Sequence, residues 1–324
     1  MFAIWNDTTQ PDTTRLKAMD DLFFKHYLMT DADSAYFHAQ QMLDFATKKG
    51  LKMYQANALH NMGAVEKIKG SLKKSLELNN RSLVLREEIG DKKGIGRSLA
   101  NIGGILDQQG DRLNGLHHYE RALVYFEEIG NNSLTAHALN NIGSIYSYLG
   151  NYPKAIQYIS RSMDVLKGSD DGYFKANTLL HLASICLEIE DFAKAKKYGE
   201  MCKDITKKIN YRLGESYALL LLGYILSEEG KHEGSLAYCE EALLLNKKTD
   251  DIDILLGAYQ LMATNYQQKG DYDKALDFFE KSQKLAESSD RKDAVIDNII
   301  SMGQVYILKK VKRTPLNGAK KGST

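Results

Sequence analysis

Small residues recur in this chain at intervals of 40, and this period constrains the fold more than any other feature. Aligning the sequence with itself at a shift of 40 gives a first column without gaps. Its members are Gly63, Gly103, Gly143, Ala183, Gly223, Ala263 and Gly303. A fixed period over most of a chain is typical of stacked repeats, in which each unit is one supersecondary element.

Two further columns with the same spacing describe a helix pair. The turn column contains Gly70, Gly110, Gly150, Glu190, Gly230 and Gly270, usually followed by a polar residue. Glycine ends one helix, and the polar residue caps the next. Small residues also recur early in the second helix, at Ala35, Ser75, Gly115, Ala155, Ala195, Ser235 and Ala275. Between units, the predicted N-caps are Asp91, Asn131, Asp171 and Asp251.

The columns therefore predict an all-α solenoid of antiparallel helix pairs. Only three prolines interrupt a chain that is 43% apolar, which favours long helices over strands. We expect seven pairs, at residues 12–50, 51–90, 91–130, 131–170, 171–210, 211–250 and 251–290. Residues 1–11 are an N-terminal extension, 292–310 a final single helix, and 311–324 a disordered basic tail.

The two ends of the array depart from the pattern. Phe23 stands where later units have glycine, as expected of an atypical end repeat, and Thr30 with Asp31 forms the first turn. The final helix is apolar almost all round. We expect it to contact another helix, a second subunit or a missing continuation of the chain.

Composition and motifs argue against several functions. The 43 basic and 42 acidic residues give a net charge of +1, which provides no general attraction to nucleic acid or membranes. No apolar run reaches the roughly 18 residues of a membrane span. The three cysteines lack CxxC spacing, so we expect free thiols, no metal site and no cofactor. No phosphate loop, zinc helix or nucleophile elbow occurs, and we predict a cytoplasmic protein that is not an enzyme.

Two segments carry a resemblance to a known family. GDYDKALDFFEKS at 270–282 resembles the second helix of a tetratricopeptide repeat, and LNNIGSIY at 139–146 resembles the first helix. The 40-residue unit is similar to the long, kinesin-light-chain type. The resemblance implies a right-handed superhelical array whose first helices line a concave groove for peptides.

A further phrase, EEIGDKKG at 87–94, is similar to repeat regions of bacterial signalling proteins, as are residues 5–10 and 12–15. In that group the repeats often precede a histidine kinase or a class III nucleotide cyclase. We expect either a stand-alone adaptor or a fragment that lacks its output domain.

Two rows of residues are predicted to face the groove. One row comprises Asn57, Arg97, His137, Asn177 and Tyr217. The other comprises Asn61, Asn101, Asn141, His181, Leu221 and Leu261. An asparagine amide donates and accepts hydrogen bonds, as a peptide backbone requires. In similar long repeats an asparagine ladder grips the ligand backbone, a role carried here to the asparagines at 61, 101 and 141. The alternative is that these amides bond between neighbouring helices.

Other predicted site residues lie in the same projection. His60, Asn140 and Arg97 are on the polar half, and Arg97 is suited to a ligand carboxylate. The histidines lie in different units, so groove positions are favoured over a metal site. Towards the C-terminus the columns turn apolar, with Leu220, Leu221 and Tyr224. One hypothesis is an apolar anchoring half, and the alternative is that curvature or the chain's own tail covers these leucines.

These patterns predict a protein-protein interaction scaffold or adaptor that binds an extended peptide, within a signalling assembly. The first alternative is a sensory or regulatory region of a larger bacterial signalling enzyme. The second is an oligomerisation element that self-associates through the final helix.

Overall fold

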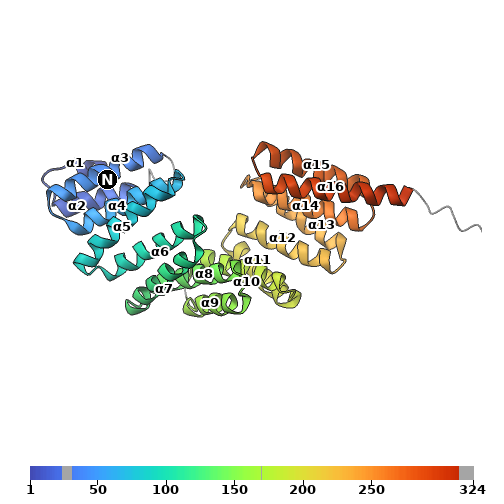
Figure 1. Ribbon diagram of the computed structural model, residues 1–324, viewed down its shortest axis with the longest axis horizontal. Coiled ribbons are helices and arrows are strands. Elements are labelled where there is room, and N and C mark those ends of the chain that lie inside the picture. Colours follow the sequence, from blue (N-terminus) through green and yellow to red (C-terminus); the bar gives the residue numbers. More distant parts are fainter. Residues whose placement is uncertain (24–30, 169, 314–324) are drawn as a thin grey trace, which may run out of the picture. The chain divides into compact units, whose positions relative to one another are not determined.

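The computed structural model describes residues 1–23, 31–168 and 170–313. Within these ranges the regular elements are helices and no strand is present (Figure 1). The helices are α1 (Phe2–Asn6), α2 (Asp12–Leu22), α3 (Ala32–Lys48), α4 (Lys52–Ile68), α5 (Leu72–Ile89), α6 (Lys92–Gln108), α7 (Arg112–Glu128), α8 (Asn132–Tyr148), α9 (Tyr152–Val165), α10 (Gly172–Glu188), α11 (Phe192–Lys208), α12 (Arg212–Glu228), α13 (His232–Asn246), α14 (Ile252–Gln268), α15 (Tyr272–Ser288) and α16 (Lys292–Arg313).

The chain forms two compact units, the first from Met1 to Lys167 and the second beginning at Gly168. We call them unit 1 and unit 2. Within each unit, helices that follow one another in the sequence pack together. Leu99, Ile102 and Leu139 lie fully buried in the core of unit 1. This arrangement confirms the predicted all-α solenoid of helix pairs.

The columns of small residues let the two helices of a pair approach closely. A Cβ atom added to Gly103 would lie 3.0 Å from the carbonyl oxygen of Gly115 on the next helix. A Cβ atom added to Gly143 would lie 2.4 Å from Cγ1 of Ile159, closer than real Cβ contacts. Larger residues at these positions would therefore push the helices apart.

The predicted caps are confirmed. The side chains of Asp91, Asn131, Asp171 and Asp251 each accept a hydrogen bond from the backbone N–H three residues later, at 2.9–3.1 Å. The turn column also has the expected left-handed backbone, with φ of +77° at Gly70. The positive φ persists at 59° where Glu190 replaces glycine.

The ends of the array differ from expectation in one detail. The final helix, α16, continues to Arg313, three residues beyond the predicted end at 310. A Cβ atom at Gly303 would meet no atom within 4 Å, because α16 is the last helix that the structure describes and no second helix packs on this face there. Asp31 caps α3 by accepting a hydrogen bond from the Ser34 N–H, whereas Thr30 and the basic tail at 314–324 lie outside the described residues.

A hydrogen-bond position near the pair contact recurs along the array. The hydroxyls of Ser82 and Ser162 donate to the carbonyl oxygens of Ala56 and Ala136, both at 2.8 Å. Cys202 occupies the same column, and its thiol donates to a backbone carbonyl at 3.3 Å. The free cysteines are Cys186, Cys202 and Cys239, all buried. Burial raises the pKa of the Cys202 thiol to about 12.

None of the helices in the described ranges is both long enough and apolar enough to cross a membrane.

Candidate functional site

A cavity of about 750 Å³ lies in unit 1 against the helices α4, α6 and α8, the first helices of three successive pairs. We call it the first-helix pocket. Five of the predicted site residues line it: His60, Arg97, Asn101, His137 and Asn141. Lys67, Ala100, Gly104, Tyr119, Phe126, Leu134 and Ala138 complete its lining. The lining therefore joins polar side chains from three repeats with apolar side chains.

Helical spacing brings these side chains to one face. Arg97, Asn101 and Gly104 follow one another at intervals of four and three residues on α6. His137 and Asn141 have the same interval of four on α8. Residues three or four apart lie above one another on a helix surface, so each helix presents a short polar stripe.

Two glycines of α6 let side chains of other helices approach it closely beside the pocket. A Cβ atom on Gly96 would lie 2.5 Å from Cε1 of Phe126, so only glycine lets this ring pack against α6. A Cβ atom on Gly104 would lie 2.9 Å from the hydroxyl of Tyr119 and 3.6 Å from Nζ of Lys67. The hydroxyl of Tyr119 and the ammonium of Lys67 thus approach α6 where it lacks a side chain.

His60 and Asn101 hold each other across two repeats. Nδ2 of the Asn101 amide lies 3.0 Å from Nδ1 of the His60 ring. Burial, together with the positive charges of Arg86 and Arg97, lowers the pKa of His60 to about 4. The ring is therefore neutral at pH 7, and its Nδ1 accepts from the amide. This bond orients Asn101 and leaves its carbonyl oxygen for another donor.

The pocket carries positive charge. Neither Lys67 nor Arg97 forms an ion pair within the described part of the chain, and Arg97 is exposed. The described residues that line the cavity include no aspartate or glutamate. The surface therefore favours an anionic group on whatever enters it.

Asn61 does not join this site. Its side chain is only 1% exposed, and Nδ2 donates to Oδ1 of Asp20 on α2 at 2.7 Å. Burial raises the pKa of Asp20, while the bond from Asn61 and the charges of Arg86 and Arg97 oppose that rise. The prediction that Asn61 faces the groove with Asn101 and Asn141 is wrong, because α2 packs against α4 and covers Asn61. Its amide instead satisfies a buried carboxyl.

Two neighbouring asparagines also lie outside the pocket lining. Oδ1 of Asn57 accepts a hydrogen bond from Arg86 at 3.1 Å, so Asn57 helps to hold a buried guanidinium. Asn140 is half-buried, and its Oδ1 is enclosed without a hydrogen-bond partner among the described residues. A ligand role for either residue stays a prediction.

The remaining predicted residues belong to unit 2. Asn177 and His181 are exposed on α10, and the Tyr217 hydroxyl donates to Oδ1 of Asp251 at 3.4 Å. Leu220 and Leu221 are half-buried because each packs against a core cluster. These leucines support their own unit, and anchoring of a ligand by them stays a prediction.

Tyr224 lines a different cavity of unit 2, of about 420 Å³, which we call the acidic pocket. Its other lining residues are Ser184, Leu187, Glu188, Glu190, Phe192 and Glu228. Burial raises the pKa of the Tyr224 hydroxyl, and the carboxylates of Glu228 and Glu188 raise it further. Across all described residues, no group of three His, Cys, Asp or Glu side chains is placed to hold a metal ion.

Sequence reasoning missed Lys67, Gly104 and Tyr119. Lys67 lies two helical turns after His60, so the face of α4 that contains His60 was a signal that could have identified it. Gly104 is 40 residues after Ala64, and Ala64 lies on the same face of α4 as His60. Tyr119 comes from the second helix α7 and enters the pocket only because position 104 is glycine.

The tetratricopeptide repeat family model matches residues 101–168, 134–208 and 215–306, which together cover more than half of the chain. The chain therefore belongs to the tetratricopeptide repeat family. This membership confirms the resemblance of the segments at 139–146 and 270–282. No curated protein matches the sequence.

Solved structures share the fold at low sequence identity. RapI in its apo form is 15% identical, with 85% of this chain and 99% of that chain covered and a TM-score of 0.68. A Rap protein complexed with competence and sporulation factor is 10% identical, with 94% and 99% covered and a TM-score of 0.57. The apo quorum sensor NprR from B. thuringiensis is 13% identical, with 93% and 89% covered and a TM-score of 0.62.

Proposed function

We propose that the chain is a protein-interaction scaffold that holds an extended, acidic peptide segment of a partner in the first-helix pocket. One observation carries the proposal. Three successive first helices present two amides, Asn101 and Asn141, and two cations, Lys67 and Arg97, to one cavity of about 750 Å³.

The two amides are suited to a peptide backbone. An extended segment presents alternating N–H and C=O groups, and each asparagine side chain offers one donor group and one acceptor group. Asn101 is already oriented by His60, so less side-chain freedom is lost when a ligand binds. Asn141 provides the equivalent group one repeat later.

The cations favour an acidic side chain or a carboxylate on that segment. Arg97 offers a planar guanidinium that pairs with a carboxylate through two parallel hydrogen bonds. Ala100, Ala138 and Leu134 provide apolar contact beside it. The likeness to a Rap protein complexed with competence and sporulation factor, and to the quorum sensor NprR, supports a role in cytoplasmic signal transduction.

A displayed library of random short peptides, selected on the whole chain, supplies ligands for the test. We expect the selected peptides to be enriched in aspartate and glutamate. The double variant Asn101→Ala, Asn141→Ala should bind them roughly 30-fold more weakly by calorimetry, because each lost hydrogen bond contributes about 1 kcal/mol.

The matched control is Asn80→Ala, which removes an exposed asparagine of the second helix α5 and should leave binding unchanged. Equal affinity of wild type and double variant, with both folded by circular dichroism, would remove the pocket from the proposal.

A second candidate function is self-association through α16. Its exposed apolar residues are spaced symmetrically about the point between Gly303 and Gln304, since reversing the helix sets Ile296 opposite Val311 and Ile300 opposite Ile307. Two antiparallel copies would therefore bury matching layers. Sedimentation of the chain at micromolar concentration tests this, and a monomer there counts against it.

A further inference from the structure

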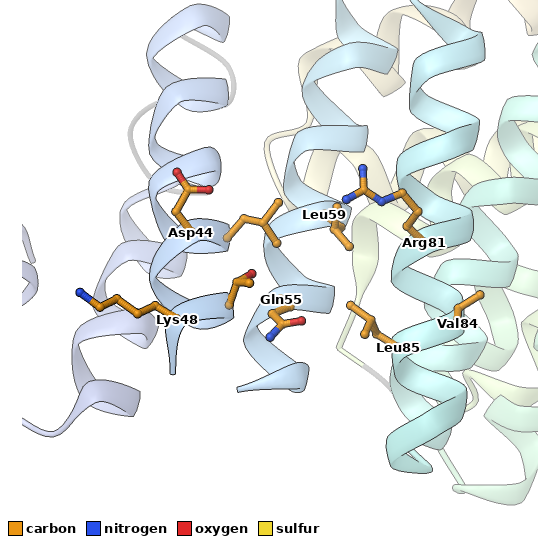
Figure 2. Close-up of a pocket in the computed structure, with 9 residues that line it drawn as sticks. Asp44, Lys48, Gln55, Leu59, Arg81, Val84 and Leu85 are labelled. Atoms are coloured by element: carbon orange, nitrogen blue, oxygen red, sulfur yellow. The ribbon is translucent and has the colours of Figure 1, made fainter. Parts of the chain in front are cut away.

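Unit 1 has a second cavity, of about 740 Å³, between α3 and α5. These are the second helices of two successive pairs, whereas the first-helix pocket lies against first helices. We call this second cavity the outer groove (Figure 2). Leu43 of α3, Leu59 of α4 and Leu85 of α5 form its apolar lining. Val84 at its edge is 53% exposed. The groove thus offers exposed apolar surface that an apolar side chain can cover.

The repeat register explains why the groove exists at this place. Forty residues after Gln55 stands Ile95, which is 5% exposed and belongs to the core, and forty after Leu85 stands Tyr125, which packs against that core. Gln55 instead turns its amide to the carbonyl oxygen of Ala46 at 3.3 Å. The first pair of neighbouring second helices therefore lacks apolar volume that the next pair has.

Among the described residues, the groove also lacks an ion pair that the next two repeats have. Arg81, Arg121 and Arg161 occupy one column on the second helices. Arg121 pairs with Glu87 at 4.0 Å, and Arg161 pairs with Glu127. The position equivalent to Glu87 and Glu127 beside Arg81 is residue 47, which is an uncharged threonine.

Arg81 consequently has no ion-pair partner within the described residues. Figure 2 shows its side chain extending from α5 toward Leu59, whereas Lys48 extends away from the cavity. The carboxylate on the facing helix, Asp44, accepts a hydrogen bond from Gln40 at 2.8 Å. Asp44, Lys48 and Arg81 form no ion pair among the described residues, so the groove combines an apolar lining with a net charge of +1.

We propose that the outer groove is a second docking site, distinct from the first-helix pocket, for a partner segment with a bulky apolar side chain beside an aspartate or glutamate. The apolar side chain enters between Leu43 and Leu85, and the carboxylate pairs with Arg81. It thereby takes the place that glutamate holds beside Arg121 and Arg161.

The chain offers a direct test, because its own next repeat shows how to remove the free charge. Thr47→Glu introduces the missing acid, which should pair with Arg81 as Glu87 pairs with Arg121. The probe is a displayed library of random short peptides, selected on the full chain carrying Lys67→Glu and Arg97→Glu, so that the first-helix pocket does not attract the acidic peptides. Affinities of the selected peptides are then measured by fluorescence anisotropy.

We expect selected peptides in which leucine, isoleucine or phenylalanine lies within one helical turn of an acidic residue. Thr47→Glu and Arg81→Glu should each weaken their binding at least about tenfold. The matched control Arg121→Glu, which changes a paired arginine of the same column, should leave the affinity within about twofold. Circular dichroism confirms that each variant is folded.

Three outcomes overturn the proposal: selection that yields no acidic-apolar peptides, unchanged affinity for Thr47→Glu and Arg81→Glu, or an equal loss with Arg121→Glu. None of them bears on the first-helix pocket, because its two cations are already replaced in the selection background. Conversely, if Asn101→Ala with Asn141→Ala does not weaken the binding of peptides selected on the wild-type chain, the proposal for the outer groove is unaffected.

Discussion

The first-helix pocket of unit 1 and the acidic pocket of unit 2 share two columns of the repeat, those of Lys67 and Gly104, yet they carry opposite charge. Position 67 is lysine in the first, and the equivalent position in the second is Leu187. Position 104 is glycine in the first, and Ser184 and Tyr224 stand there in the second. The acidic side chains of Glu188, Glu190 and Glu228 come from columns that do not line the first-helix pocket, so the charge of each pocket depends on which columns line it as well as on the residues in the shared ones.

The first prediction, with the largest expected effect, reverses that charge difference. Lys67→Glu with Arg97→Glu should weaken binding of acidic library-selected peptides at least about 100-fold, because two charge-assisted contacts become repulsive. Calorimetry measures the loss.

The matched control makes the opposite exchange in the acidic pocket, with Glu188→Lys and Glu228→Lys. It should leave the same peptides bound. If both double variants changed affinity in proportion to their net charge, the effect would be a general field and the comparison of the two pockets would fail.

The second prediction concerns acid stability of unit 1. The pKa of His60 is about 4 in the folded chain, below the ordinary value of 6.5, chiefly because of burial. Between these values the unfolded chain binds the proton more strongly, so the free energy of unfolding falls as pH decreases, and the full contribution is present above pH 6.5. Because the ring is half-buried, we expect a loss of about 1–2 kcal/mol by roughly pH 4.5.

Urea unfolding above pH 6.5 and at roughly pH 4.5 measures this loss of unfolding free energy. Amide hydrogen exchange should locate the loss in α4 and α6 rather than in α12 of unit 2. His60→Asn removes the titrating ring and should flatten the pH dependence. The same dependence in that variant would assign it to other groups.

The third prediction, with the smallest effect, tests the turns. Unit 1 has glycine at its turns with positive φ, such as Gly110 at +86°, whereas unit 2 places Glu190 in the same column at 59°. A left-handed backbone costs a non-glycine residue about 1–2 kcal/mol. Glu190→Gly should therefore raise the free energy of unfolding by about 1 kcal/mol, and Gly110→Glu should lower it by a similar amount.

Urea titration of both single variants provides the measurement. Opposite signs support the turn argument, and a destabilised Glu190→Gly would show that the side chain of Glu190 contributes more than its backbone strain costs.

Much of the fold was predictable because turns and caps are local. The left-handed turn at Gly70 and the caps at Asp91 and Asp251 depend on residue types within one helical turn. The close approach of Gly103 to Gly115 follows from the spacing of small residues. Features of this kind are written in short stretches of sequence.

The candidate site was predictable only in part. The period correctly placed Arg97, Asn101 and His137 on one surface, but it treated Asn61 as equivalent to Asn101. Whether such an amide is covered depends on the neighbouring repeat, and at position 61 that neighbour is α2 with its buried Asp20. The binding roles of all these residues stay predictions.

The distribution of buried thiols has a practical consequence. The three cysteines all lie beyond Gly168, at residues 186, 202 and 239, and each is at most 1% exposed. A maleimide in solution can reach Cys202 only after the contact between α10 and α11 opens, and the raised pKa slows the reaction further. The labelling rate of the native chain therefore reports how often unit 2 opens, and it does not respond to opening that is confined to unit 1.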